Sequence, residues 1–161
     1  MRVYIDFDGV ILDTISVTYE MIKKLDLGKE EEIRDFYYNL DWDSLIKQTP
    51  QINDSIKCIK KLINNGFDVK ILTHIISYNE GLGKIKYLKK LIPELEVILV
   101  PKAIDKCDMV NPKGAILIDD FTGNLDLWNK YGGIPIKFSD SGKKSKYQTI
   151  TKLDEIIDLY K

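Results

Sequence analysis

The sequence lacks the features that mark secreted or membrane-spanning proteins. Its apolar runs all fall short of the ~20 residues that cross a bilayer, and it opens on a strand pattern rather than on a signal-peptide pattern. It has only two cysteines, Cys58 and Cys107, which are too few for a disulfide framework and fit a reducing compartment. We therefore expect a cytoplasmic protein that does not associate with membranes.

An excess of charge of one sign is also missing. The 24 basic and 25 acidic side chains give a formal net charge of −1, so no overall field attracts nucleic acid polymers or a membrane surface. Small phosphorylated molecules stay compatible with this balance, because local charge placement governs their binding. A hydrophobic fraction of 44% in 161 residues supports one packed domain over residues 1–161.

Apolar strand patterns alternate with helical patterns along the chain. The expected strands are residues 3–5, 67–73, 96–100, 115–118 and 134–138. Helical spacing of apolar residues lies between them, and a last helix is expected to bury Ile150, Leu153, Ile156 and Ile157. This alternation predicts an α/β fold, with a five-stranded, mainly parallel sheet covered by helices on both faces.

Residues 15–49 interrupt this alternation, and we expect them to form a small helical insertion over the edge of the first strand. Four aromatic side chains gather in its second half: Phe36, Tyr37, Tyr38 and Trp42. Two interpretations are open for these rings. They either pack the insertion onto the domain, or one or two of them stack on a substrate base.

The segment that follows the first strand carries the strongest chemical signal. Alternation sends Asp6 and Asp8 to the same side, with Phe7 turned the other way, and Gly9 lets the chain swing away. Two carboxylates at a strand end need a partner or a metal if they are buried. Hard oxygen ligands at the carboxyl edge of an α/β sheet suit Mg²⁺.

The segment Asp6-Phe7-Asp8-Gly9-Val10, followed by Asp13-Thr14, resembles the opening motif of the haloacid dehalogenase (HAD) superfamily of phosphatases. The resemblance implies a Rossmann-like HAD fold, in which Asp6 is the nucleophile and Asp8 the general acid and base. A surface turn with two solvated acids is the less favoured interpretation of this short motif, and later segments must decide between the two.

Three later segments follow the superfamily order. Thr73, after the apolar Ile71 and Leu72, matches the second motif, a Ser or Thr that binds phosphate. The third motif is a lysine that neutralises the aspartate and phosphate charge; we favour Lys106 over Lys102, with Lys113 a distant third. The only histidine, His74, is left out of the catalytic set, because Asp8 already supplies an acid and base. Its ring either contacts substrate or packs locally.

The adjacent acids Asp119 and Asp120 end the fourth apolar strand. Without a cation between them and Asp6 they would repel each other, and a helix-cap interpretation explains one acid but not both. The pattern D-D-x-x-x-N-x-x-x-W that starts at Asp119 resembles the 5'-nucleotidase branch of the superfamily, which includes the 5'(3')-deoxyribonucleotidases.

Together these resemblances imply an Mg²⁺-dependent phosphomonoester hydrolase that acts through an aspartyl-phosphate. Mg²⁺ would be held by Asp6, the Asp8 backbone carbonyl, Asp119 and Asp120, and Thr73 and Lys106 would hold the phosphate oxygens. Nucleoside monophosphates are the expected substrates. The alternatives are a HAD phosphatase for another small phosphorylated metabolite and a non-catalytic HAD-like interaction protein. A signalling receiver domain is disfavoured because its acidic pair comes early in the chain and its lysine late.

Overall fold

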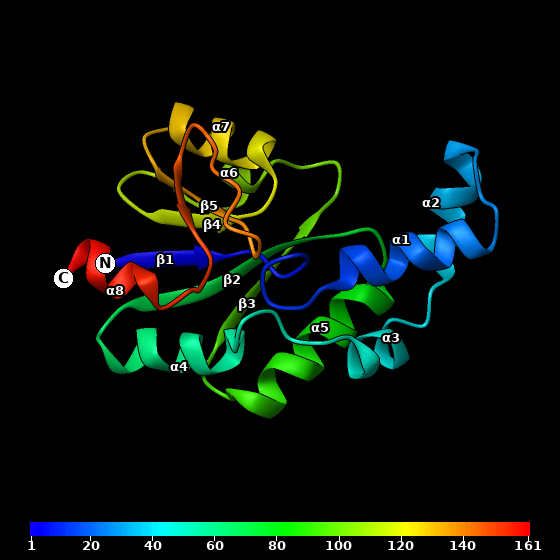
Figure 1. Cartoon of the computed structure of the whole chain (residues 1–161), viewed down its shortest axis with the longest axis horizontal. Coiled ribbons are helices and arrows are strands. Elements are labelled where there is room, and N and C mark those ends of the chain that lie inside the picture. The colour runs from blue at the N-terminus through cyan, green and yellow to red at the C-terminus, as the bar shows by residue number, and fades with distance from the viewer.

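A parallel sheet forms the centre of the computed structural model, which describes residues 1–161 (Figure 1). Its strands are β1 (Arg2–Ile5), β2 (Asp68–Ile75), β3 (Glu96–Pro101), β4 (Ile116–Asp119), β5 (Ile134–Phe138) and β6 (Gln148–Ile150). Their order is β3-β2-β1-β4-β5-β6, and every neighbouring pair is parallel. The α/β class and the parallel sheet are thus confirmed.

The expected count of five strands is wrong, because β6 adds a sixth strand beside β5. Ile150, which we expected on the last helix, belongs to β6 and pairs in register with Phe138. The strand has only three residues, too few for a period-2 pattern to emerge. Ile150 also stands three residues before Leu153, a spacing that mimics a helix. Pairing with β5, distant in sequence, decides the structure.

The chain forms eight helices. They are α1 (Thr14–Lys24), α2 (Glu30–Asn39), α3 (Trp42–Gln48), α4 (Ser55–Asn64), α5 (Tyr78–Leu91), α6 (Lys106–Met109), α7 (Thr122–Lys130) and α8 (Glu155–Tyr160). In Figure 1, α6 and α7 lie on one side of the sheet, and α4, α5 and α8 lie on the other. None of the helices combines the length and the hydropathy needed to cross a membrane.

The alternation of side chains along β1 creates two cores. Val3 and Ile5 point into the larger one, which also receives Leu62 of α4 and Leu88 of α5. Tyr4 points into the smaller one on the opposite face. Because both faces of β1 are buried, its position is fixed on two sides, and so is the segment that follows it.

The strand order reverses between β1 and β4, since the chain progresses outward from β1 to β3 on one side and from β4 to β6 on the other. The crevice at the carboxyl ends of such a pair is where open α/β sheets bind ligands. The Asp6 backbone N–H donates to the Ile118 carbonyl at 2.9 Å, which joins the ends of the two strands. Asp6 and Asp119 therefore come to the same edge.

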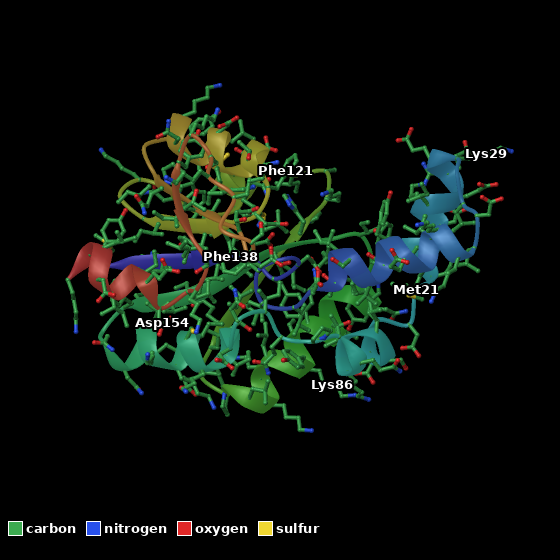
Figure 2. The ribbon with its side chains drawn as sticks, viewed as in Figure 1. Met21, Lys29, Lys86, Phe121, Phe138 and Asp154 are labelled. Carbon is green, nitrogen blue, oxygen red and sulfur yellow. The ribbon has the colours of Figure 1, made fainter.

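Helices α1, α2 and α3 occupy the stretch expected as an insertion. α1 and α2 extend away from the sheet, with Lys29 at the far end (Figures 1 and 2). α3 packs instead against α5. Gly83 permits this close approach, because a Cβ there would lie 3.2 Å from Cδ1 of Ile46 and 3.5 Å from the Trp42 backbone. The insertion is thus attached to the helix that follows β2.

Trp128 on α7 provides a test of the smaller core. It is fully buried, and its ring N–H donates to the Ala115 carbonyl at 2.9 Å. Its ring packs edge-on against the Tyr4 ring, with 5.4 Å between the ring centres. Trp128→Ala removes the ring and the donor together, so we expect it to lower the free energy of unfolding by about 3–5 kcal/mol in urea titrations. Tyr19→Ala, at an aromatic that is 66% exposed, should change it by less than about 0.5 kcal/mol. A loss below about 1 kcal/mol for Trp128→Ala would contradict this account.

Candidate active site

Three carboxylates meet at the carboxyl edge of β1 and β4. Asp6 follows β1 directly, Asp119 is the last residue of β4, and Asp120 comes next. One oxygen from each can be chosen so that all lie within 4.8 Å of one another. Asp6 is 8% exposed and Asp119 is fully buried, so this concentration of negative charge is largely removed from solvent.

Lys106 supplies the cation for two of these acids. It is the first residue of α6, and its Nζ lies 2.9 Å from Asp6 Oδ1 and 2.7 Å from Asp119 Oδ2. Burial alone would lower the pKa of Lys106, but Asp119 and Asp6 outweigh that effect and raise it, so the side chain stays charged. Burial raises the pKa of Asp6, against the opposing effect of Lys106.

The other two lysines considered from the sequence do not contact these acids. Lys102 is exposed and lines a separate cavity, and Lys113 is exposed in the turn that precedes β4, at the opposite end of this strand from Asp119. Lys106 is therefore the lysine that the fold brings to Asp6. The turn that leads from β3 into α6 places it there, a path that strand and helix patterns alone do not define.

Asp119 and Asp120 have different surroundings. Asp119 accepts hydrogen bonds from the Phe121 backbone N–H at 2.8 Å and from Asn124 Nδ2 at 2.9 Å, in addition to Lys106. For Asp120, burial raises the pKa to about 7, with further contributions from Asp6 and Asp119. The protein thus satisfies Asp119 by itself and leaves Asp120 short of positive charge.

This donor set fits a hard divalent cation. Carboxylate oxygens are the ligands that Mg²⁺ prefers, and a cation beside Asp120 would offset the charge that Lys106 leaves uncompensated. Asp6 and Asp120 are the side chains best able to hold it, because the oxygens of Asp119 are already engaged by donors from the protein.

Gly9 permits the close approach of Asp120. Its φ of +71° favours glycine, and a Cβ at this position would lie 2.4 Å from Asp120 Oδ2. The glycine of the Asp6–Val10 motif is therefore needed for conformation and for space.

Asp8 lies apart from the three-acid group. Its Oδ1 accepts from the Thr14 hydroxyl at 2.7 Å, and its Oδ2 accepts from Lys84 Nζ at 2.6 Å. It lines a cavity of about 280 Å³ between the insertion and the sheet edge. The walls of this cavity include Thr18, Tyr37 and Trp42 from the insertion and His74, Ile76 and Lys102 from the domain.

Thr73 does not end its strand as expected. β2 continues to Ile75, because β3 pairs with it as far as the Ile75–Pro101 partners. The Thr73 hydroxyl is buried, accepts from Lys84 Nζ at 3.1 Å and donates to the His74 carbonyl at 3.3 Å. Nε2 of His74 lies 2.9 Å from the Ile104 carbonyl, and burial lowers the pKa of this ring. The His74 ring thus packs locally and also lines the Asp8 cavity.

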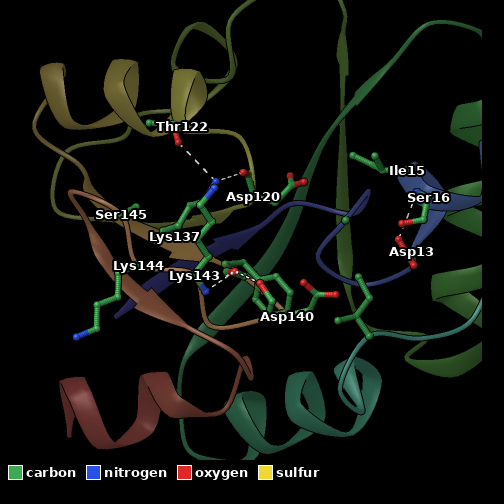
Figure 3. Close-up of a pocket in the computed structure, with 15 residues that line it drawn as sticks. Asp13, Ile15, Ser16, Asp120, Thr122, Lys137, Asp140, Lys143, Lys144 and Ser145 are labelled. Atoms are coloured by element: carbon green, nitrogen blue, oxygen red, sulfur yellow. Dashed lines mark hydrogen bonds between the residues drawn. The ribbon is translucent and has the colours of Figure 1, made fainter. Parts of the chain in front are cut away.

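Sequence reasoning missed two lysines at the site. Lys84 holds Asp8, and Lys137 directs its Nζ at the Asp120 carbonyl and at Thr122 Oγ1, 3.5 Å away (Figure 3). Lys137 pairs in register with Asp119. A lysine near the carboxyl end of the neighbouring strand is therefore the sequence feature that could have identified it. Lys84 follows Glu80 by four residues, which resembles an ordinary exposed helical pair.

The raised pKa of Asp120 predicts a pH-dependent stability. Burial raises the pKa of folded Asp120 to about 7 from the usual 3.8 of an aspartate carboxyl. The folded state therefore binds more protons between these values, and this contribution to stability falls as the pH rises through the window. In metal-free urea titrations, the unaltered protein should therefore lose stability relative to Asp120→Asn as the pH rises from 4 to 7.

Mg²⁺ should reverse this trend, because it binds the ionised carboxylate. We expect added Mg²⁺ to raise the melting temperature more at pH 8 than at pH 5, and to lose this effect in Asp120→Asn. Asp158→Asn, at an exposed acid of α8, is the matched control. An equal response to Mg²⁺ in Asp120→Asn would show that Asp120 is not a ligand.

Comparisons with known proteins agree on the fold. No protein-family model and no curated protein matches the sequence, but solved structures match the fold over nearly all of the chain. A HAD-superfamily hydrolase of subfamily IA from Geobacter sulfurreducens has a TM-score of 0.64 at 14% identity, covering 98% of each chain. A HAD phosphatase from Thermococcus onnurineus has a TM-score of 0.61 at 16% identity, covering 98% of this chain and 96% of that one.

A D,D-heptose 1,7-bisphosphate phosphatase from Burkholderia thailandensis has a TM-score of 0.58 at 14% identity and covers 99% of each chain. These matches do not support the 5'-nucleotidase branch in particular. At such identities the likeness concerns the fold alone. The chain has the Rossmann-like α/β fold of the HAD-superfamily hydrolases and phosphatases.

Proposed function

We propose that the protein is an Mg²⁺-dependent phosphomonoester hydrolase that acts through an aspartyl-phosphate on Asp6. One observation carries the proposal: Lys106 bridges Asp6 and Asp119 at the switch point of the sheet, with Asp120 beside them. A charged lysine among three acids suits a site that receives a phosphoryl group, since the group needs both a nucleophile and compensating charge.

The residues divide the reaction between them. An oxygen of Asp6 attacks phosphorus while the bond to the leaving oxygen breaks, which splits one difficult displacement into two easier ones. Asp8 protonates the leaving alkoxide and then takes a proton from the water that hydrolyses the aspartyl-phosphate. Lys106 offsets charge on the phosphate oxygens. When bound, Mg²⁺ supplies further charge compensation for the phosphoryl group.

Thr73 is the proposed contact for another phosphate oxygen. Its hydroxyl would exchange the 3.3 Å contact with the His74 carbonyl for the phosphate. Thr73 is the third residue from the end of β2. It lies at the same sheet edge as Asp6, because β1 and β2 are neighbours.

Two other functions fit less well. A receiver domain has the sheet order 2-1-3-4-5, whereas this chain has 3-2-1-4-5-6. A non-catalytic interaction protein on the same scaffold would not require Asp6, Lys106 and Asp119 to be in contact in a buried site. That function predicts no turnover of any phosphomonoester.

The direct test is hydrolysis of 4-nitrophenyl phosphate with Mg²⁺. Asp6→Asn should lower kcat by about a thousandfold or more, because an amide cannot form the phospho-enzyme. Asp158→Asn, at an exposed acid of α8, should leave the rate unchanged. Retention of more than about a thousandth of the rate by Asp6→Asn would remove Asp6 as nucleophile. Absence of turnover in the unaltered protein, over a panel of phosphomonoesters, would favour the interaction protein.

For the substrate we propose nucleoside monophosphates. The support is the resemblance after Asp119 together with the cavity beside Asp8, whose volume of about 280 Å³ is near the lower end for ligand cavities. Of the four insertion aromatics, Tyr37 and Trp42 line this cavity. Trp42 is 3% exposed and donates to the Tyr37 carbonyl at 3.1 Å, so it is mainly a core residue. Tyr37, which is half-buried, is the better candidate for base stacking.

Tyr37→Leu tests this substrate. Stacking of a base on an aromatic contributes ~1–3 kcal/mol, so we expect KM for a nucleoside monophosphate to rise about 5- to 150-fold, while KM for 4-nitrophenyl phosphate changes little. Tyr38→Leu is the control, since Tyr38 is 59% exposed and does not line the cavity. Equal losses on both substrates, with a lowered melting temperature, would show that Tyr37 only supports the insertion.

A further inference from the structure

Lys84 on α5 is fully buried and makes four polar contacts. Its Nζ lies 2.6 Å from Asp8 Oδ2, 2.7 Å from Glu80 Oε1, 2.9 Å from the His74 carbonyl and 3.1 Å from Thr73 Oγ1. A buried lysine is uncommon unless it is paired. Here the contacts join the segment after β1, the end of β2 and the first turns of α5.

The surroundings hold Lys84 in one place. Glu80 fixes the pair to the β2–α5 loop, because its Oε2 accepts from the Ile76 backbone N–H at 2.7 Å. The Nζ also lies 5.3 Å from the centre of the Phe7 ring and 5.6 Å from that of Trp42. Such contacts leave the ammonium group little freedom to follow a moving partner.

A role in stability alone does not explain this arrangement well. Glu80, four residues earlier on the same helix, would be a sufficient counter-ion for Lys84. Replacing a buried ion pair by apolar side chains is often neutral for stability. The second carboxylate that Lys84 contacts is Asp8, the acid that lies apart from the Asp6 group and lines the cavity between insertion and domain.

We propose that Lys84 is the positioning residue for Asp8, which it holds toward that cavity for proton transfer to and from the leaving oxygen. The proposal rests on the phosphatase function proposed above. Asp8 Oδ2 is held by Lys84 and Oδ1 by the Thr14 hydroxyl. Each carboxylate oxygen has a second lone pair, so a fixed Asp8 can still exchange a proton with the substrate.

Substrates with different leaving groups can test this role. A basic alkoxide must receive a proton as its bond to phosphorus breaks, and general acid catalysis commonly contributes 10²–10⁴-fold. A nitrophenolate is a weak base that departs without one. A disordered Asp8 should therefore slow release of an alcohol far more than release of nitrophenol, whereas general damage to the site should slow both equally.

The experiment compares kcat/KM for an alkyl phosphate and for 4-nitrophenyl phosphate, because this constant covers the steps up to departure of the leaving group. Lys84→Met should lose about a hundredfold or more on the alkyl phosphate and less than about tenfold on the nitrophenyl ester. Lys86→Met is the matched control: its side chain, labelled in Figure 2, is 71% exposed and pairs only with Asp43 of α3, so the variant should lose nothing on either substrate.

A second variant keeps the test valid if Lys84→Met does not fold. Lys84→Met leaves Asp8 and Glu80 without their cation, so the double variant Glu80→Gln/Lys84→Met, which removes one of these charges, should fold better and show the same split. Equal losses on the two substrates, in whichever variant retains its circular dichroism and a cooperative melt, would overturn the proposal. Failure of both variants to fold would assign Lys84 to stability and would also overturn it.

These outcomes separate the two proposals. If the unaltered protein hydrolyses neither ester, the phosphatase function fails. If it hydrolyses both and the Lys84 variants lose equally on them, the phosphatase function stands and the positioning role fails.

Discussion

The contact of Lys106 with Asp6 and Asp119 is the interaction on which the rest of the site depends. Three carboxylates whose oxygens approach within 4.8 Å repel each other strongly in a buried setting, and Lys106 compensates two of them at 2.9 and 2.7 Å. It also joins β1, β4 and α6 at one point. The remaining excess of negative charge falls on Asp120, the acid to which we assign a share of the Mg²⁺ site.

Two buried lysines divide the acids into separate groups. Lys106 serves Asp6 and Asp119, and Lys84 serves Asp8 and Glu80. The proposed nucleophile Asp6 and the proposed general acid Asp8 therefore have separate partners. Asp6 and Asp8 stand two residues apart in the chain, yet the turn at Gly9 and these two cations give each its own environment.

The fold fixes the positions of the two groups of acids. β1 is buried on both faces, so the Asp6–Gly9 segment leaves it in a defined direction. α3 packs closely on α5 at Gly83, which places Trp42 beside Lys84 and the insertion beside the Asp8 cavity. In the proposed function, the insertion would shape the leaving-group side of the site and the sheet edge the phosphate side.

Local patterns in the sequence determined the α/β class, most of the strands, and the acids at the ends of β1 and β4, because apolar runs that end in carboxylates are visible within a few residues. Tertiary structure decided what depends on distant pairing. β6 forms only because β5 lies beside it, and β2 passes Thr73 only because β3 pairs with it. In a sequence, Lys84, Lys102, Lys106 and Lys137 are all ordinary lysines. Packing buries Lys84 and Lys106 against carboxylates and leaves Lys102 in solvent, and a buried charge acquires a role only through the partner that the fold brings to it.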